Sequence, residues 1–275
     1  MNETTTSRRE ERYEFGKNWQ KYLACIDEER IEEAASSLKR MLHLENLENH
    51  TFLDAGSGSG LFSLAARKLG ASVRSFDYDP DSVAATAELK KRYFPGDPHW
   101  MVERGSVLDR GYLASLGRYD VVYSWGVLHH TSDMWQAFRN VATLVADNGW
   151  LYISIYNYQP LMSSVWRTIK RLYNRSPHFL RTIMNVSYYL FLASTQFGFD
   201  WLRGRNPLDR HRGKGRRGMS MYRDVADWLG GYPFEVATPD EVCRFYGGLG
   251  FTRVELKTVG RKSGCNEFVF KKASH

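Results

Sequence analysis

Apolar residues recur in two alternating patterns between positions 51 and 156. Short apolar runs predict strands, and longer stretches with apolar residues every three or four positions predict helices. The expected strands are 51–54, 72–76, 99–102, 119–124 and 150–155, and the expected helices are 61–69, 81–93 with Asp81 as its cap, and 134–145. Strands that alternate with helices through short connections form a parallel sheet with helices on both faces.

The same pattern resumes near the carboxyl end, with a helix at 239–249 and strands at 252–259 and 266–271. We expect these last two strands to form a hairpin at the edge of the sheet. Ahead of the sheet, 13–44 reads as helical, because Ile31, Leu38 and Met41 recur at helical spacing. The expected segments are therefore 1–50 (amino-terminal helices), 51–156 (core), 157–218 (helical insert) and 219–275 (completion of the core sheet).

The insert at 157–218 has a different character from the core. Apolar residues from Met162 to Tyr173 recur at helical spacing, with Arg167, Lys170 and Arg171 on the other side, which predicts a basic amphipathic helix. The stretch 182–199 carries no charge but contains too many polar residues for a convincing membrane span. The stretch 202–218 is rich in Gly and Arg.

Charge is distributed unevenly along the chain. The 275 residues carry a net charge of +7, yet the stretch 161–217 holds twelve basic residues against only Asp200 and Asp209. The remainder holds 26 basic and 29 acidic residues. A basic surface over the whole body, typical of nucleic-acid binders, is therefore not expected.

Cysteine usage and the amino-terminal residues indicate a reducing compartment. Cys25, Cys243 and Cys265 form no C-x-x-C pair, which argues against a disulfide framework or a zinc site. Residues 1–12 are polar and lack the apolar region of a signal peptide. We expect a cytoplasmic protein, with peripheral membrane contact through the basic insert as an open alternative.

A glycine-rich turn carries the clearest chemistry. Gly56, Gly58 and Gly60 follow the first strand and precede a helix, and Asp77 ends the second strand. Glycine lets a ligand approach the backbone closely. Ligands of open parallel sheets bind at the carboxyl ends of the strands, and a carboxylate after the second strand can accept hydrogen bonds from ribose hydroxyls. The pattern therefore predicts a nucleoside-type cofactor.

The spacing separates this turn from other nucleotide-binding loops. A dinucleotide fingerprint would need Gly or Ala at position 61, which is Leu61. A G-x-x-x-x-G-K-[ST] phosphate loop is absent from the sequence. An NAD-dependent oxidoreductase is thus disfavoured.

Four motifs resemble those of the class I methyltransferases that use S-adenosylmethionine (SAM). They are Leu53-Asp54-Ala55-Gly56-Ser57-Gly58-Ser59-Gly60, Phe76-Asp77-Tyr78-Asp79, Gly105-Ser106-Val107-Leu108-Asp109 and the stretch 119–130. The last is similar to that of the small-molecule branch, near the quinone-biosynthetic O-methyltransferases. The resemblance implies an α/β, Rossmann-like, doubly wound seven-stranded sheet with an antiparallel last strand, amino-terminal helices and a helical lid insert.

The resemblance also implies roles for individual residues. Gly56, Ser57 and Gly58 would hold the methionine end of SAM, with Asp54 ordering the turn, or merely capping it. Asp77 would take the ribose hydroxyls. Tyr78, Ser106 and Val107 would lie near the adenine, although many relatives carry Asp where this chain has Ser106. Ser124 and Trp125 would border the sulfonium. The stretch 15–19 could cover the cofactor, with Trp19 as a cofactor contact or a packing residue.

Methyl transfer mainly needs positioning, and a base is needed only when the acceptor carries a proton. His130, and next His129, follow the fourth strand and are the candidate bases, because a histidine titrates near neutral pH; capping or packing is the alternative for each. Tyr156 and Tyr222 flank the insert and are expected to line the acceptor pocket. The acidic residues show no metal-ligand spacing, so no metal is expected.

Three alternatives stay open beside a small-molecule O- or N-methyltransferase. An RNA or protein methyltransferase would use the Arg-rich 202–217 to bind phosphates. A non-catalytic module of the same fold would dock on a membrane through 163–173. An oxidoreductase would require NAD in place of SAM. The acceptor and the oligomeric state do not follow from the sequence.

Overall fold

The computed structural model describes residues 13, 15, 16, 19, 22–202 and 221–274, without the side chains of 196–202 and 221–224. Contacts divide the chain into two compact units. The core unit comprises 14–163 and 234–275, and the insert unit comprises 1–13 and 164–233. The expected segments at 1–50, 51–156, 157–218 and 219–275 stay a prediction.

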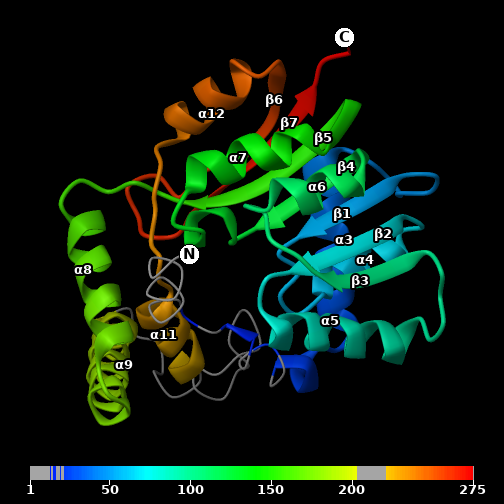
Figure 1. Cartoon of the computed structure of the whole chain (residues 1–275). Coiled ribbons are helices and arrows are strands. Elements are labelled where there is room, and N and C mark those ends of the chain that lie inside the picture. Colours follow the sequence, from blue (N-terminus) through cyan, green and yellow to red (C-terminus); the bar gives the residue numbers. More distant parts are fainter. Residues whose placement is uncertain (1–12, 14, 17–18, 20–21, 203–220, 275) are drawn as a thin grey trace, which may run out of the picture. The chain divides into compact units, whose positions relative to one another are not determined.

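The core unit is built on one seven-stranded sheet in the order β3-β2-β1-β4-β5-β7-β6 (Figure 1). The strands are β1 (Thr51–Ala55), β2 (Ser72–Asp77), β3 (Trp100–Arg104), β4 (Tyr119–Trp125), β5 (Val145–Tyr156), β6 (Phe251–Lys257) and β7 (Cys265–Lys272). The first five strands pair in parallel, and β7 runs antiparallel to both β5 and β6. The predicted fold class is confirmed, including the antiparallel last strand and the hairpin at the edge.

Helices cover both faces of this sheet. One face packs on α3 (Glu28–Leu42), α4 (Leu61–Lys68) and α5 (Pro80–Tyr93), and the other on α6 (Arg110–Leu116), α7 (Met134–Thr143) and α12 (Pro239–Gly247). Neighbouring strand residues serve opposite faces: Phe52 packs with the first set and Leu53 with the second. Both are fully buried, as expected where every strand lies between two helical layers.

Several predicted boundaries need correction. The cap of α5 is Asp79, which accepts from the Asp81 amide, because Pro80 takes the first helical position and leaves the cap to the residue before it. The predicted helix 13–44 is broken: a short 3-10 turn η1 (Leu23–Cys25) precedes an extended Ile26, and Asp27 caps α3. The helix α6 was not predicted, and β5 begins at Val145 rather than at 150.

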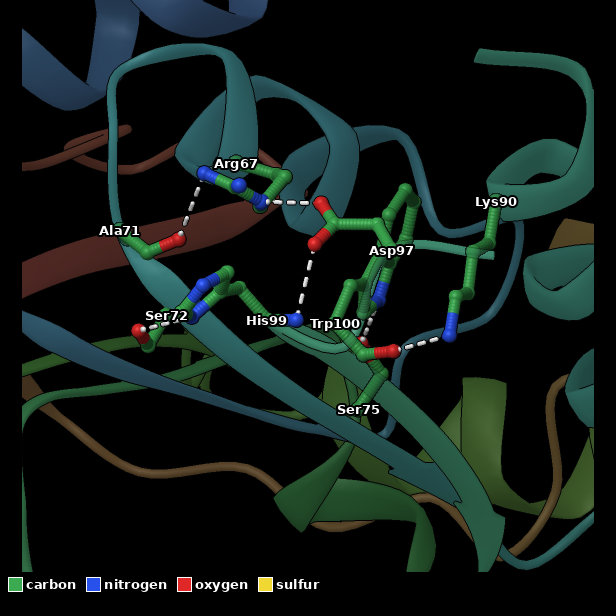
Figure 2. Close-up of polar contacts among 8 residues, drawn as sticks. All are labelled: Arg67, Ala71, Ser72, Ser75, Lys90, Asp97, His99 and Trp100. Carbon is green, nitrogen blue, oxygen red and sulfur yellow. Dashed lines mark hydrogen bonds and ion pairs between the residues drawn. The ribbon is translucent and has the colours of Figure 1, made fainter. Parts of the chain in front are cut away.

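Side-chain hydrogen bonds join α4 to the loop before β3, and β3 to β2 (Figure 2). The Arg67 guanidinium of α4 donates to the Asp97 carboxylate at 2.6 Å, and Asp97 accepts from the His99 amide at 2.8 Å. The indole of Trp100 donates to the Ser75 hydroxyl at 2.9 Å. This last bond belongs to a buried chain that continues toward the glycine-rich turn.

The insert unit is a helical body with its own small core. Its helices are α8 (Met162–Arg175), α9 (His178–Leu202) and α11 (Met221–Gly230). Tyr173, Val225 and Leu229 are buried together. Lys170, predicted on the polar side of α8, is instead fully buried: its ammonium donates to the Trp228 carbonyl and lies 4.3 Å from the centre of the Trp228 ring. The attraction between the ammonium and the face of the indole ring offsets part of the hydration that the charge loses on burial.

Candidate active site

The glycine-rich turn lies where the order of the strands reverses. From β1 the chain continues to β2 on one side, whereas β4 lies on the other side of β1. Open sheets bind ligands outside the carboxyl ends of their strands at such a point. The Ser124 hydroxyl, fully buried at the end of β4, donates to the Ala55 carbonyl at 2.7 Å and joins the two strand ends.

Gly56 has to be glycine for two reasons. Its φ of +93° is strained for other residues. A Cβ at this position would also overlap the side chain of Val127, which follows β4. The turn after β1 and the loop after β4 are therefore in direct backbone-to-side-chain contact.

The amides of the turn hold it against the end of β2. The amides of Gly56 and Ser57 donate to the Phe76 carbonyl at 2.8 and 3.1 Å. The Gly58 amide donates to the Asp77 carboxylate at 3.0 Å, and the other Asp77 oxygen accepts from the Asp79 amide at 2.9 Å. The predicted pair of glycine turn and carboxylate is thus brought together by the fold.

Thr86 of α5 packs against the same turn and bonds to it through its hydroxyl. Its hydroxyl lies 2.9 Å from the Ser57 hydroxyl and 3.3 Å from the Gly58 carbonyl, to which it donates. Thr86 is fully buried, and a Cβ on Gly60 would come within 2.9 Å of its methyl group. Sequence reasoning missed Thr86, because a threonine inside a helix gives no signal of its own.

Asp54 lies beneath the turn at the end of a buried hydrogen-bond chain. Its carboxylate accepts from the Ser63 hydroxyl at 2.6 Å, Ser63 lies 2.7 Å from the Ser75 hydroxyl, and Ser75 accepts from the indole of Trp100. Burial, with a smaller effect of the Asp77 charge, raises the pKa of Asp54 to about 7, although the Ser63 bond opposes the shift. Asp54 thus joins the end of β1 to α4 through Ser63, and its role in ordering the turn stays a prediction.

The residues expected near an adenine gather after β2 and β3. The Gly105 amide donates to the Asp77 carbonyl at 3.0 Å. The Arg104 guanidinium lies 5.7 Å from the centre of the Tyr78 ring and donates to the Tyr78 carbonyl. Val107 is 6% exposed, and the Ser106 hydroxyl accepts from the Leu108 amide at 3.2 Å. The Ser106 hydroxyl is thus engaged within the turn to which Ser106 belongs.

The described residues of the amino-terminal stretch lie against the same strand ends. The Gly16 amide donates to the second oxygen of Asp79 at 2.8 Å. The indole nitrogen of Trp19 would stand 3.2 Å from a Cβ added to Gly58. The ring of Phe15 lies 5.1 Å from that of His130, measured between centroids. Sequence reasoning missed Asp79, although an Asp directly before Pro80 is a helix-start signal.

The two histidines form an aromatic cluster after β4. They occupy η2 (Leu128–His130), where their rings lie 4.4 Å apart. His129 is fully buried with its ring 4.1 Å from that of Tyr156, which in turn lies 5.1 Å from the ring of Phe234. His130 is 6% exposed, which makes it the more accessible of the pair.

Glu235 holds this cluster to the loop after the histidines. Its amide donates to the His129 carbonyl at 3.0 Å, and its carboxylate accepts from the Met134 amide at 3.3 Å. Phe234 and Glu235 were not expected at the site. The contact of Phe234 with Tyr156 spans 78 positions and that of Glu235 with Met134 spans 101, and no local pattern reveals such pairs.

The remaining predicted residues are placed less directly. Trp125 ends β4 and is partly buried against the α3–α5 side of the core. Tyr222 lies in α11 of the insert unit, and its side chain is outside the described part. Within the described ranges, no three His, Cys, Asp or Glu side chains are placed to hold a metal ion. The absence of a metal requirement remains a prediction.

A comparison with protein-family models shows to which family the chain belongs. Residues 26–197 match the family model described as a methyltransferase domain, which is more than half of the chain. The chain belongs to this methyltransferase family. The predicted resemblance to the class I, SAM-dependent methyltransferases is thereby confirmed.

Two curated relatives of this methyltransferase are similar over part of their length. A ubiquinone biosynthesis O-methyltransferase of Bordetella avium is 30% identical over 117 residues, covering 42% of this chain and 46% of the relative. A ribosomal protein L11 methyltransferase of Bacillus cereus is 32% identical over 105 residues, covering 33% of each. The chain thus matches between a third and a half of the length of these relatives.

Solved structures share the fold at low sequence identity. A magnesium protoporphyrin IX methyltransferase from Synechocystis, with bound S-adenosylhomocysteine (SAH), has a TM-score of 0.52 at 14% identity, over 88% of this chain and 83% of the other. An O-methyltransferase family protein from Burkholderia thailandensis has a TM-score of 0.54 at 12% identity, over 89% and 57%. Both support the Rossmann-like methyltransferase fold.

Proposed function

We propose that this protein transfers a methyl group from SAM to an oxygen or a nitrogen of a small-molecule acceptor. One observation carries the proposal: the Asp77 carboxylate and the Gly56–Gly58 turn lie in hydrogen-bond contact at the point where the strand order reverses. Family membership and the bound SAH of one relative in fold agree with it.

The residues at this point fit the chemical groups of SAM. An ionised carboxylate accepts up to about four hydrogen bonds, which allows Asp77 to hold backbone amides and a ribose diol together. The amides of Gly56 and Ser57 are engaged by Phe76, so the turn would offer its carbonyl oxygens to the ammonium of the methionine end. Tyr78 and Val107 would supply apolar surface for the adenine.

When bound, SAM supplies a methyl group already activated on a positively charged sulfur. The protein therefore has to align the acceptor and exclude water, and positioning of this kind can contribute roughly 7–11 kcal/mol. Phe15 and Trp19 lie against His130 and Gly58 and would form part of this water-excluding cover.

His130 would accept the proton that a hydroxyl or an amine loses as its lone pair attacks the methyl carbon. The acceptor would gain the methyl group with SAH as the leaving group, and the imidazole of His130 would hold the proton. His129 is fully buried against Tyr156. We assign it a positioning role, in which it fixes the ring of its neighbour.

The cluster of Phe15, Tyr156 and Phe234 around the histidines favours a flat, largely apolar acceptor. The similarity to a ubiquinone biosynthesis O-methyltransferase points to an oxygen acceptor, such as a phenol. Tyr222 as a second acceptor contact, and a cytoplasmic location, stay predictions from the sequence.

Labelled SAM tests the function directly. The protein is incubated with methyl-labelled SAM and fractionated cell extract that retains small molecules, RNA and protein, and the labelled product is identified by mass spectrometry. We expect a labelled small aromatic product that is lost with Asp77→Asn and kept with Asp147→Asn, a surface carboxylate near the start of β5. Label in protein or RNA alone would overturn the proposal.

A further inference from the structure

The helix α9 has one face committed to the core of the insert unit. Met184, Tyr188 and Leu192 are partly buried against the cluster around Tyr173. The Asn185 amide donates to the Tyr173 hydroxyl at 3.1 Å, which fixes the rotation of α9 on α8. The residues on the opposite side of α9 are therefore held outward.

That outward side is apolar where a soluble helix would be charged. Its large side chains keep between 39% and 63% of their surface exposed: Phe179, Leu180, Ile183, Val186, Leu190 and Phe191. The residues between them on this side, Thr182, Ser187 and Ser194, are small and uncharged. Contiguous exposed apolar side chains of this kind mark an interaction surface. We name this set the α9 outer face.

The helix α8 of the same unit also exposes apolar side chains, together with arginines. Val165 and Leu172 are 47% and 60% exposed at a spacing of seven residues. Arg167, Arg171 and Arg175 follow at spacings of four on the exposed side of α8. No Asp or Glu occurs between positions 148 and 199 of the sequence, so this stretch carries a formal surplus of positive charge.

We infer that the α9 outer face docks on the surface of an anionic lipid bilayer. A helix with exposed Phe, Leu and Ile beside arginines lies in the plane of such an interface, with the apolar side chains among the acyl chains and the guanidinium groups at the phosphates. The inference concerns membrane binding and does not depend on methyl transfer.

Formal charge favours a bilayer over other occupants. Residues 162–199 of the sequence include five basic residues and no Asp or Glu. Anionic headgroups complement this surplus of positive charge. A second copy of this chain would bring the same surplus to a shared interface, where like charges repel. Among the described residues, no helix is long and apolar enough to cross a membrane.

Vesicle co-sedimentation tests the inference. The full-length protein is mixed with vesicles of phosphatidylcholine alone or with one-third phosphatidylglycerol. We expect most of the protein to sediment with the anionic vesicles and at least tenfold less with the neutral ones. Raising the salt concentration from about 50 to 500 mM should weaken the binding, because it screens the arginines.

Two paired variants assign the binding to the α9 outer face. Ile183→Asn with Leu190→Asn removes apolar contacts, and Ser187→Glu with Ser194→Glu adds negative charge without altering the packed side. Each pair should reduce binding at least tenfold. The matched control is Leu249→Asn with Val254→Asn, which changes side chains 41% and 38% exposed in the core unit and should bind like the wild type.

Three results would overturn the inference. Wild-type protein that stays with neither vesicle would refute membrane docking. Binding that survives both paired variants in folded protein, checked by circular dichroism, would place the contact elsewhere. A dimer in sedimentation velocity that the Ile183→Asn and Leu190→Asn pair dissociates, without vesicle binding, would assign the α9 outer face to self-association.

Discussion

The carboxylate of Asp77 accepts a hydrogen bond from the amide of Gly58, with 3.0 Å between oxygen and nitrogen. This bond joins the end of β2 to the turn after β1. The bond thereby positions the Asp77 carboxylate, which would hold the ribose, against the turn that would hold the methionine end of SAM. Substitutions that loosen the turn should consequently weaken cofactor binding more than they weaken the fold.

Gly56→Ala should separate the effect on cofactor binding from the effect on folding stability. The new methyl group would overlap Val127 and force a strained positive φ, so we expect SAM affinity to fall at least tenfold. Gly96→Ala is the matched control, since Gly96 also has a positive φ (72°) but no atom within 4 Å of its Cβ position. The control should lose about 1–2 kcal/mol of stability and keep the wild-type Kd. Equal Kd values for the two variants, measured by calorimetry, would count against the role of the turn.

Asp54 should make the stability of the protein fall as the pH rises. Its pKa is raised to about 7 in the folded state, whereas an unfolded Asp titrates near 3.9. Between these values the unfolded chain is ionised at Asp54 and the folded chain is not, so unfolding releases a proton. The contribution of Asp54 to stability should be greatest below about pH 4, decline toward pH 7 by roughly 4 kcal/mol, and change no further above it.

Asp54→Asn removes this titration while an amide oxygen can still accept from Ser63. Urea unfolding at pH 5, 6, 7 and 8 should show a smaller decline with pH in the variant than in the wild type. The surface substitution Asp147→Asn serves as control and should keep the wild-type decline. Parallel pH profiles for wild type and Asp54→Asn would show that burial does not raise this pKa.

His130→Gln tests the proposed base. A positioned base contributes about 10²–10⁴-fold, so we expect kcat to fall by about 100-fold or more. A histidine must be deprotonated to act, and wild-type kcat should therefore rise through neutral pH while the variant loses that dependence. His129→Gln should lower Tm and leave the shape of the pH profile intact. Full kcat for His130→Gln across pH 6–9 would exclude the role.

Gly16→Ala tests the contact of the amino-terminal stretch with the start of α5. A Cβ on Gly16 would lie 2.7 Å from the Asp79 carboxylate oxygen, which displaces the amide from its acceptor. We expect a several-fold rise in KM for SAM. Gly247→Ala, where the Cβ meets nothing within 4 Å, should leave this KM unchanged. Unchanged KM in Gly16→Ala would show that the stretch does not cover the cofactor.

The sheet could be predicted because its strands are buried on both faces. Phe52, Leu53, Val121 and Val122 leave apolar runs that only a central strand explains. The helix α6 could not be predicted, since it has seven residues and buries only Leu113 and Leu116. Too few apolar positions repeat there to define a period.

The site was predictable in its local motifs and not in its long-range contacts. Gly56 and Gly58 lie in the turn after β1 and Asp77 ends β2, so chain order alone places them at one edge. Phe15 reaches His130, and Gly16 reaches Asp79 across 63 positions, through tertiary packing alone. The burial of Lys170 likewise depends on Trp228, which lies 58 positions away. No local pattern contains such pairings.

Calorimetry with SAH tests the central claim most directly, since this product occupies the cofactor site without reacting. Wild-type protein should bind SAH with measurable heat, and Asp77→Asn should bind at least tenfold more weakly, while Asp147→Asn binds like the wild type. Absence of heat with folded wild-type protein, or equal affinity for wild type and Asp77→Asn, would contradict the account.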